Sequence, residues 1–488
     1  MHAKPCCISA HSLLTYNAGK SLSALTWLSA LLLLLTSTAF ATVVTGKQKA
    51  NPAGCTVKGP DYDPGTDVQA YAKYEGGIRN LLKQKRFKDL DCLADAARSS
   101  KARFSGGAWK LRMIYGGLEQ PAGNATEMDW KNQLQLLQSW VTANPKSITA
   151  RIALAEAYTN YAWYARGNGF SDTVSQSGWT LFSTRLKKAR EILEQASTLS
   201  SKCPEWYAAM QNVALGEGWD LAREAALFRQ AVAFEPAYDP FYRNQAVFVN
   251  PKWNGEEGDP AKLASESADR IGGPDGDILY FQIAKEIVCA CEDHEFSHMA
   301  WPRVQKGFAA LEKKYGRSLF NLNAYALMAV KTDDEELADA LFKQIGDKWD
   351  KDVWQTEEYF RETKSMAAQA GPVYARQRIV REEATANTQS PEGAAYLKDF
   401  QPRFAVFLRK CQEAAASDQS GFVFLLQIAR DGSVESAHSS EDTNAGSCLL
   451  GELKHSYDLH ETAFPPPPSP DYWLKFDMDP AMFKVATR

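Results

Sequence analysis

The stretch PEWYAAMQNVALGEGWDLAREAALFRQAVAFEP, residues 204–236, decides the fold class of this chain. It starts at Pro204 and ends at Pro236, and proline is tolerated in the first turn of a helix but not in its interior. Between the prolines, apolar residues recur at helical spacing in two segments. They are mostly small in the first segment and large in the second, which suits two helices that stack closely. The stretch therefore predicts one helix-turn-helix unit.

The same helical signal extends from about residue 66 to residue 385. The length of the 204–236 unit is close to the roughly 34-residue period of tetratricopeptide repeats. TDDEELADALFKQIG, which begins at Thr332, repeats the pattern, with Thr332 and Glu335 spaced as a capping box and Gly346 as a stop. We predict a tetratricopeptide-like helical solenoid over 66–385, interrupted by loops at 167–178 and 249–258.

The pattern changes after residue 390. GFVFLLQIA is a β-rich apolar run, Asp431-Gly432 is a hairpin turn signal, and SVESAHSS fits the partner strand. NAGSCLLGELKHSY fits a short amphipathic helix, and DYWLKFDMD alternates like a last strand. We therefore predict a small α+β module over 391–488, so that the chain as a whole is mostly α.

Composition and charge exclude some classes of function. The 488 residues are 45% apolar and 23% charged, with a formal net charge of −4. This is the composition of a folded globular protein, and its length calls for more than one domain. Nucleic-acid binding needs a basic surface, and no basic cluster stands out. We expect no nucleic acid as a partner.

The first 41 residues have the pattern of an export signal. Lys20 is followed by a long apolar run that ends in Ala39-Phe40-Ala41, the small-x-small pattern of a signal peptidase site. We interpret 1–41 as a cleaved signal peptide and 42–65 as a linker, which makes the protein periplasmic. The alternative is an uncleaved anchor in the inner membrane, with the rest of the chain facing the periplasm.

Export places the remaining cysteines in an oxidising compartment, where some of them should pair. Seven cysteines follow the signal segment: Cys55, Cys92, Cys203, Cys289, Cys291, Cys411 and Cys448. Cys411 and Cys448 both fall in the small C-terminal module, one on each predicted helix. We hypothesise a Cys411–Cys448 disulfide, because small exported modules gain stability from such a bond.

The stretch CACEDHEFSH, residues 289–298, contains His294-Glu295-x-x-His298. Two histidines at this spacing on a helix can bind Zn²⁺, with Glu295 as general base, if a third ligand such as Glu312 or Asp333 is close. Pro302 follows too soon for one continuous helix.

We therefore expect one helix to end near Cys291, another to begin around Trp301, and both histidines to lie in the connecting loop. A structural site that adds Cys289 and Cys291 is a further alternative, although its cysteine spacing is tight. Our leading interpretation is that there is no metal, no catalytic residue and no cofactor.

Three stretches of the helical region resemble a known family. RFKDLDCLADAARSSKARFSGGAWKLRMIYGGL, AWYARGNGF and VNPKWNGEEGD resemble a bacterial family of tetratricopeptide-like proteins known only as a domain of unknown function. This likeness covers most of residues 65–370 and implies a helical repeat fold without an established activity.

The last hundred residues or so are similar to the C-terminal domain of TonB-family proteins. The residues that carry the likeness are FVFLLQIARDGSVESAHSS, SCLLGEL and FPPPPSPDYW. The resemblance implies a protein-binding module of the cell envelope that can accept a strand from a partner. Residues 21–44 hold no ionisable side chain, so we do not expect coupling to ion flow.

Together these observations lead us to expect a non-enzymatic interaction scaffold of the bacterial periplasm, with a protein or peptide partner. The solenoid would offer one surface and the strand edge of the TonB-like module a second. The alternative function is a zinc-dependent hydrolase that uses His294, Glu295 and His298.

Overall fold

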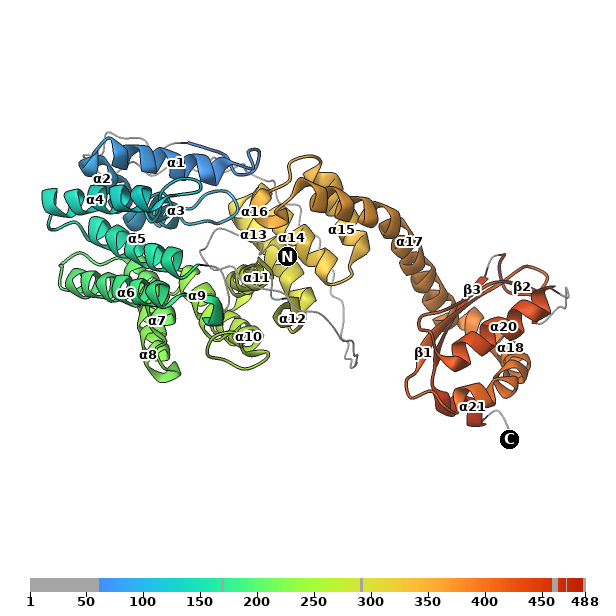
Figure 1. The fold of residues 1–488 in the computed structure, drawn as a ribbon. Helices are drawn as coiled ribbons and strands as arrows, with labels where there is room; N and C mark the ends of the chain where they lie inside the picture. Colours follow the sequence, from blue (N-terminus) through green and yellow to red (C-terminus); the bar gives the residue numbers. More distant parts are fainter. Residues whose placement is uncertain (1–60, 168–170, 290–292, 459–463, 471, 486–488) are drawn as a thin grey trace. The chain divides into compact units, whose positions relative to one another are not determined.

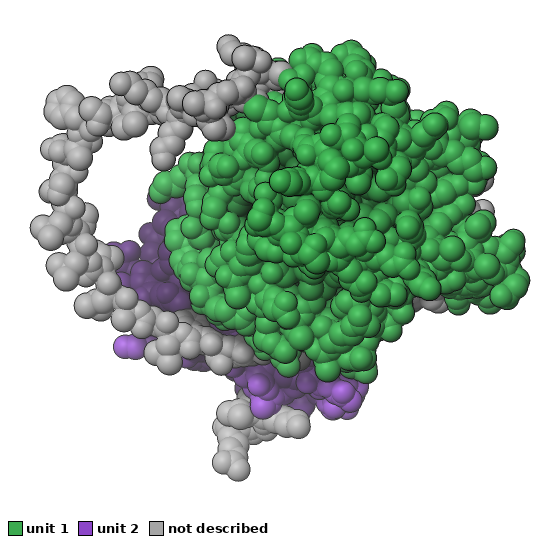
Figure 2. Space-filling model, turned by 90° about the vertical axis from the view of Figure 1, so that its left-hand side faces the viewer, with its two compact units in different colours: residues 1–365 green, residues 366–488 purple. Residues whose placement is uncertain are grey.

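The computed structural model describes residues 61–167, 171–289, 293–458, 464–470 and 472–485. They belong to two compact units, residues 1–365 and 366–488 (Figure 2). The expected signal segment 1–41 and residues 42–60 of the expected linker lie outside the described residues. Among the helices that the structure describes, none is long and apolar enough to cross a membrane.

Unit 1, residues 1–365, is helical throughout its described part (Figure 1). Its elements are α1 (Ala70–Lys83), α2 (Phe87–Ser100), α3 (Lys110–Gly116), α4 (Glu127–Ala143), α5 (Ile148–Arg166), the 3-10 helix η1 (Ser171–Thr173), α6 (Gln176–Ser197), α7 (Pro204–Glu217), α8 (Leu221–Phe234), α9 (Pro240–Phe248), α10 (Asp259–Ile271), α11 (Gly273–Cys289), α12 (Asp293–Ser297), α13 (Trp301–Tyr315), α14 (Leu319–Lys331), α15 (Glu335–Ile345), α16 (Lys351–Trp354) and the start of α17 (Glu357–Gln389).

The helix-turn-helix unit at 204–236 is confirmed as α7 and α8. Pro204 is the first residue of α7, and Gly218 ends that helix in the left-handed conformation with φ of 65°. Asp220 then caps α8, because its side chain accepts a hydrogen bond from the backbone N–H of Arg223 at 2.8 Å. Helix α7 buries three alanines, Ala208, Ala209 and Ala214, whereas α8 buries Leu227 and Phe228. The size difference lets the two helices approach closely.

Helices that are neighbours in the sequence also pack on one another from α4 to α8. In Figure 1, α4, α5 and α6 lie side by side. Helix α11 differs from these amphipathic helices, because nearly every residue from Ile278 to Cys289 is buried. It packs against α9, α10, α13 and α14. A helix buried all round is expected to be apolar all round, so its polar residues call for an explanation.

Helix α17 crosses the boundary between the two units at residues 365 and 366. We predicted the helical domain to continue to residue 385, close to the end of α17 at Gln389. The end of α17 belongs to unit 2 because Asn387 and Thr388 bond to the backbone of strand β3 (Tyr472–Met478). Helical periodicity alone does not reveal which unit a helix packs against.

Unit 2, residues 366–488, contains the small α+β module that we predicted over 391–488, together with most of α17. After α17 come α18 (Pro391–Lys410), α19 (Gln412–Ala415), β1 (Phe422–Ile428), β2 (Val434–Ser439), α20 (Asn444–Asp458), β3 and α21 (Pro480–Val485). The three strands form one antiparallel sheet in the order β2-β1-β3. The Asp431-Gly432 turn is confirmed, with Gly432 at φ of 85°. The short helix α21 was not predicted.

The core of unit 2 lies on one face of this sheet. Alternate residues of β1, including Phe424 and Leu426, pack with Phe400 and Phe404 of α18 and with Leu449 of α20. The apolar run that the sequence shows in this stretch has no strict alternation, and Leu425 on the opposite face of the sheet is buried as well.

Candidate functional site

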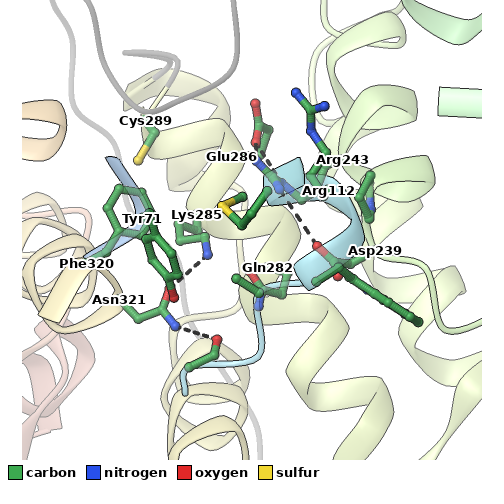
Figure 3. Close-up of a pocket in the computed structure, with 15 residues that line it drawn as sticks. Tyr71, Arg112, Asp239, Arg243, Gln282, Lys285, Glu286, Cys289, Phe320 and Asn321 are labelled. Carbon is green, nitrogen blue, oxygen red and sulfur yellow. Dashed lines mark hydrogen bonds and ion pairs between the residues drawn. The ribbon is translucent and has the colours of Figure 1, made fainter. Parts of the chain in front are cut away.

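The polar residues of α11 line a cavity of about 70 Å³ inside unit 1 (Figure 3). Gln282, Lys285 and Glu286 face it from α11, Asp239 and Arg243 from the start of α9, Arg112 from α3, Tyr71 from α1, and Asn321 from α14. The cavity thus gathers ionisable side chains from segments far apart in the sequence.

Lys285 is the least compensated charge in this cavity. Its side chain is only 8% exposed, and its Nζ donates a hydrogen bond to the neutral Oδ1 of Asn321 at 2.9 Å. It forms no ion pair with any carboxylate in the described part of the chain. Burial, reinforced by the nearby charge of Arg243, lowers the pKa of Lys285 to about 7.

Arg243, in contrast, is paired. Its Nε donates to Glu286 Oε2 at 2.8 Å, and its Nη1 lies 3.8 Å from Asp239 Oδ2. A second nitrogen of the guanidinium also bonds to Glu286 (Figure 3). Both nitrogens bond to the same carboxylate oxygen, Oε2, and such charge-assisted hydrogen bonds are stronger than neutral ones.

Arg112 continues the charged network beside the cavity. It donates to Glu119 at 2.7 Å and to Glu205 at 3.0 Å, and it lies 3.4 Å from Glu156. Three buried carboxylates around one guanidinium cannot all remain ionised at low cost. Burial and the charge of Glu205 raise the pKa of Glu156 well above its ordinary value.

The cavity has room for water beside the Lys285 amine. Among the described residues that line it, no hydroxyl or thiol is hydrogen-bonded to a basic side chain. The sequence alone did not reveal this cavity, because AKEIVCAC predicts only the end of a helix. The signal that could have found it is the pair Lys285-Glu286 in the middle of an otherwise apolar run.

The histidine motif lies elsewhere in unit 1. Helix α11 ends at Cys289 and α13 begins at Trp301, both close to the predicted positions. The expectation of a plain loop between them was wrong, because residues 293–297 form the short helix α12. His294 lies in α12, and His298 directly follows it. One turn of helix is compatible with Pro302, since Pro302 is only the second residue of α13.

Glu295 does not have the position that the zinc motif requires. Its side chain is 3% exposed, and its Oε2 accepts a hydrogen bond from the backbone N–H of Gly258 at 3.1 Å. The carboxylate beside the two histidines is Glu257, and not Glu312 or Asp333. Glu257 Oε1 lies 3.1 Å from Nε2 of His294 and 3.1 Å from Nε2 of His298.

The alternative structural metal site that adds Cys289 and Cys291 is not supported. Cys289 is disulfide-bonded, so its sulfur is not free to act as a thiolate ligand. Cys291 lies outside the described residues. Cys92 is disulfide-bonded as well, whereas Cys203 is a free, buried thiol.

In unit 2, Cys411 and Cys448 form the disulfide that we predicted, with their Cα atoms 5.7 Å apart. The bond ties the end of α18 to α20, and Cys411 is fully buried. Both helices belong to the core of the module, so the bond holds them over the same face of the sheet.

The two edges of the sheet differ. At β3, Thr388 of α17 accepts a hydrogen bond from the backbone N–H of Lys475 at 3.0 Å, and Asn387 donates to the carbonyl of Trp473 at 3.1 Å. The edge of β3 is therefore covered. At β2, against which α20 packs, no such hydrogen bond to the backbone of Ala437 or Ser439 is present among the described residues, and the middle of the strand is half-buried or exposed.

Comparison with protein-family models, with curated proteins and with solved structures finds no match to this chain.

Proposed function

We propose that this protein is a non-enzymatic interaction scaffold of the cell envelope, which binds an extended segment of a partner protein along β2. Unit 1 is the tetratricopeptide-like part of this scaffold, and unit 2 is the TonB-like binding module. The observation that carries the proposal is the open edge of β2, beside a β3 edge that is covered.

The hydrogen-bond pattern of the sheet identifies the groups that face outward. The carbonyl of Val423 accepts a hydrogen bond from the N–H of Ser440, so Val423 points its backbone groups toward β2. Inward and outward residues alternate in an antiparallel pair. Ser436 and His438 therefore bond to β1, whereas Ala437 and Ser439 direct their N–H and C=O groups away from the sheet. An added strand pairs with such groups.

The outer face of the sheet provides side-chain contacts next to this edge. The imidazole of His438 stacks on the indole of Trp473, with ring centroids 5.9 Å apart. Leu425 of β1 pairs with His438 in the register and is 7% exposed. An aromatic surface beside an open edge can select among peptides, because every second side chain of an added strand lies over it.

Two observations support the envelope location. The segment 1–41 has the pattern of an export signal. The described part of the chain contains a disulfide between Cys411 and Cys448, and disulfides persist in oxidising compartments.

The alternative of a zinc hydrolase has less support. A general base must reach the water or the substrate that it deprotonates. The Glu295 carboxylate is buried and bound to the Gly258 N–H, so the motif lacks its catalytic acid-base group.

A proline substitution at the edge tests the proposal. Ala437→Pro removes an N–H that faces away from β1, and proline is tolerated on an edge strand in this position. Ala437→Ser keeps the N–H and is the matched control. We expect the full chain and Ala437→Ser to capture the same envelope proteins, and Ala437→Pro to lose them with an unchanged melting temperature. Amide exchange in residues 434–440 should slow down on binding.

Equal capture by Ala437→Pro, or binding without any change in exchange at 434–440, would place the interaction elsewhere and contradict the proposal.

A further inference from the structure

We propose that Glu257, His294 and His298 form a binding site for a divalent transition-metal ion, with Zn²⁺ as the best fit. The three residues come from two segments, the loop before α10 and the region around α12. The proposal is independent of the open edge of β2, which lies in the other unit.

The geometry of the three side chains is that of a ligand set. Glu257 Oε1 lies 3.1 Å from each of the two Nε2 atoms, and one ligand atom from each of the three residues lies within 4.8 Å of the others. Zn–N and Zn–O bonds of about 2.0–2.1 Å at a tetrahedral angle separate neighbouring ligand atoms by about 3.3 Å. Small side-chain rotations therefore suffice to place an ion between the three atoms.

The backbone on both sides is held in place. The buried carboxylate of Glu295 accepts the Gly258 N–H at 3.1 Å, which fixes the residue next to Glu257. Phe296 is 2% exposed, so α12 is anchored by its apolar side. The N–H of Ala300 donates to the hydroxyl of Tyr280 at 2.8 Å, which ties the end of this region to α11. Such outer contacts orient the ligands of a metal site.

The donor set indicates the class of ion. Two imidazoles and one carboxylate suit Zn²⁺ and its neighbours, whereas Mg²⁺ and Ca²⁺ prefer oxygen ligands. Three protein ligands leave at least one position of a tetrahedral ion for water. The three side chains are 71%, 35% and 62% exposed for His294, His298 and Glu257, so an ion can enter directly from solvent.

Glu295 is a positioning residue in this site and not a ligand. It holds the loop that presents Glu257, and a bound ion would then join that loop to α12. This arrangement gives the His-Glu-x-x-His motif a role that needs no catalysis: its histidines bind the ion and its glutamate fixes the third ligand.

The test uses the full chain, freed of metal with a chelator and titrated with Zn²⁺ against a chromophoric competitor. We expect one equivalent to bind, and Co²⁺ to give a visible absorption band typical of a tetrahedral site. His294→Ala and Glu257→Gln each remove a ligand. Each should weaken Zn²⁺ binding by more than roughly 10- to 100-fold, which is the effect of losing a residue that only orients a ligand. Glu266→Gln, which removes an exposed carboxylate from α10, is the matched control and should bind like the parent chain.

Glu295 provides a second, separate readout. Glu295→Ala should weaken Zn²⁺ binding by about 10- to 100-fold, and Glu295→Gln should restore it, because an amide oxygen can still accept the Gly258 N–H. Absence of stoichiometric Zn²⁺ binding, or equal affinity in the parent and Glu257→Gln chains, would overturn the proposal. A loss in Glu295→Gln as large as in Glu295→Ala would overturn the positioning role.

Discussion

Nζ of Lys285 lies 2.9 Å from Oδ1 of Asn321, so a buried amine is held by a neutral amide. The same amide donates through its Nδ2 to the carbonyl of Gly106 at 2.8 Å, which fixes its orientation. Lys285 therefore has a defined hydrogen-bond partner but no direct ion pair in the described residues, and the nearby charges of Asp239 and Glu286 only partly offset the effect of burial on its pKa. Its ionisation is consequently linked to the stability of unit 1.

The lowered pKa of Lys285 should make the stability of unit 1 depend on pH. Burial and Arg243 lower its pKa from 10.5 to about 7 in the folded state. Between pH 7 and about pH 10.5 the unfolded chain holds this proton and the folded chain does not, so the free energy of unfolding rises with pH. The contribution is at most about 1.4 kcal/mol per pH unit. Lys285→Met should lack this rise in urea denaturation between pH 7 and 9, and the exposed Lys131→Met should keep it.

Glu75 should lower the free energy of unfolding as the pH rises from 4.5 to 7. Burial and the charge of Glu119 raise its pKa from 4.5 to about 7, against the opposing charge of Arg112. Between pH 4.5 and 7 the folded chain holds a proton that the unfolded chain has lost, so this group destabilises the fold as pH rises. Glu75→Gln should therefore gain stability relative to the parent chain between pH 5 and 7, by up to about 1.4 kcal/mol per unit. If the difference in stability between Glu75→Gln and the parent chain stayed constant from pH 5 to 7, this would contradict a raised pKa of Glu75.

Gly307 should not tolerate a methyl group. A Cβ at this position would overlap the carbonyl oxygen of Asp277 and lie 2.8 Å from Cβ of Phe281, where α13 crosses α11. Gly307→Ala should destabilise unit 1 by about 1–3 kcal/mol, since overpacking forces helices apart. Gly76, inside α1, has nothing within 4 Å of such a Cβ. Gly76→Ala should instead stabilise the protein by about 0.5–1 kcal/mol, and calorimetry of both variants checks the contrast.

Loss of the Cys411–Cys448 disulfide should weaken unit 2 selectively. Replacing both cysteines by alanine should reduce its free energy of unfolding by about 2–4 kcal/mol. Hydrogen exchange in urea should then show earlier opening of peptides from α18 and α20, while peptides from α7 and α8 exchange as before. Equal opening in both units would argue against a local effect of this bond.

The sequence predicted the elements better than their partners. Periodicity located α7, α8 and the three strands of unit 2, because burial of one face leaves a repeating pattern. The capping box at Thr332 was wrong: the side chain of Asp334 caps α15, and Thr332 bonds back to the carbonyl of Met328. Several polar residues near a helix start can serve as its cap, and spacing alone does not select among them.

The candidate sites show the same limit. His294 and His298 could be named from their spacing, because the motif is local. Glu257 could not be found, since it approaches them only when the loop before α10 folds against α12. The role of Glu295 was wrong for the same reason, because its partner Gly258 is 37 residues away in the chain.

The cover that Asn387 and Thr388 place over β3 limits how this sheet can grow. A strand can therefore add to this sheet only at β2, so the module can bind one added strand or pair with one copy of itself. Pairing of two copies through β2 would leave a covered β3 at each outer edge, so it would end in a dimer and not in a growing fibre.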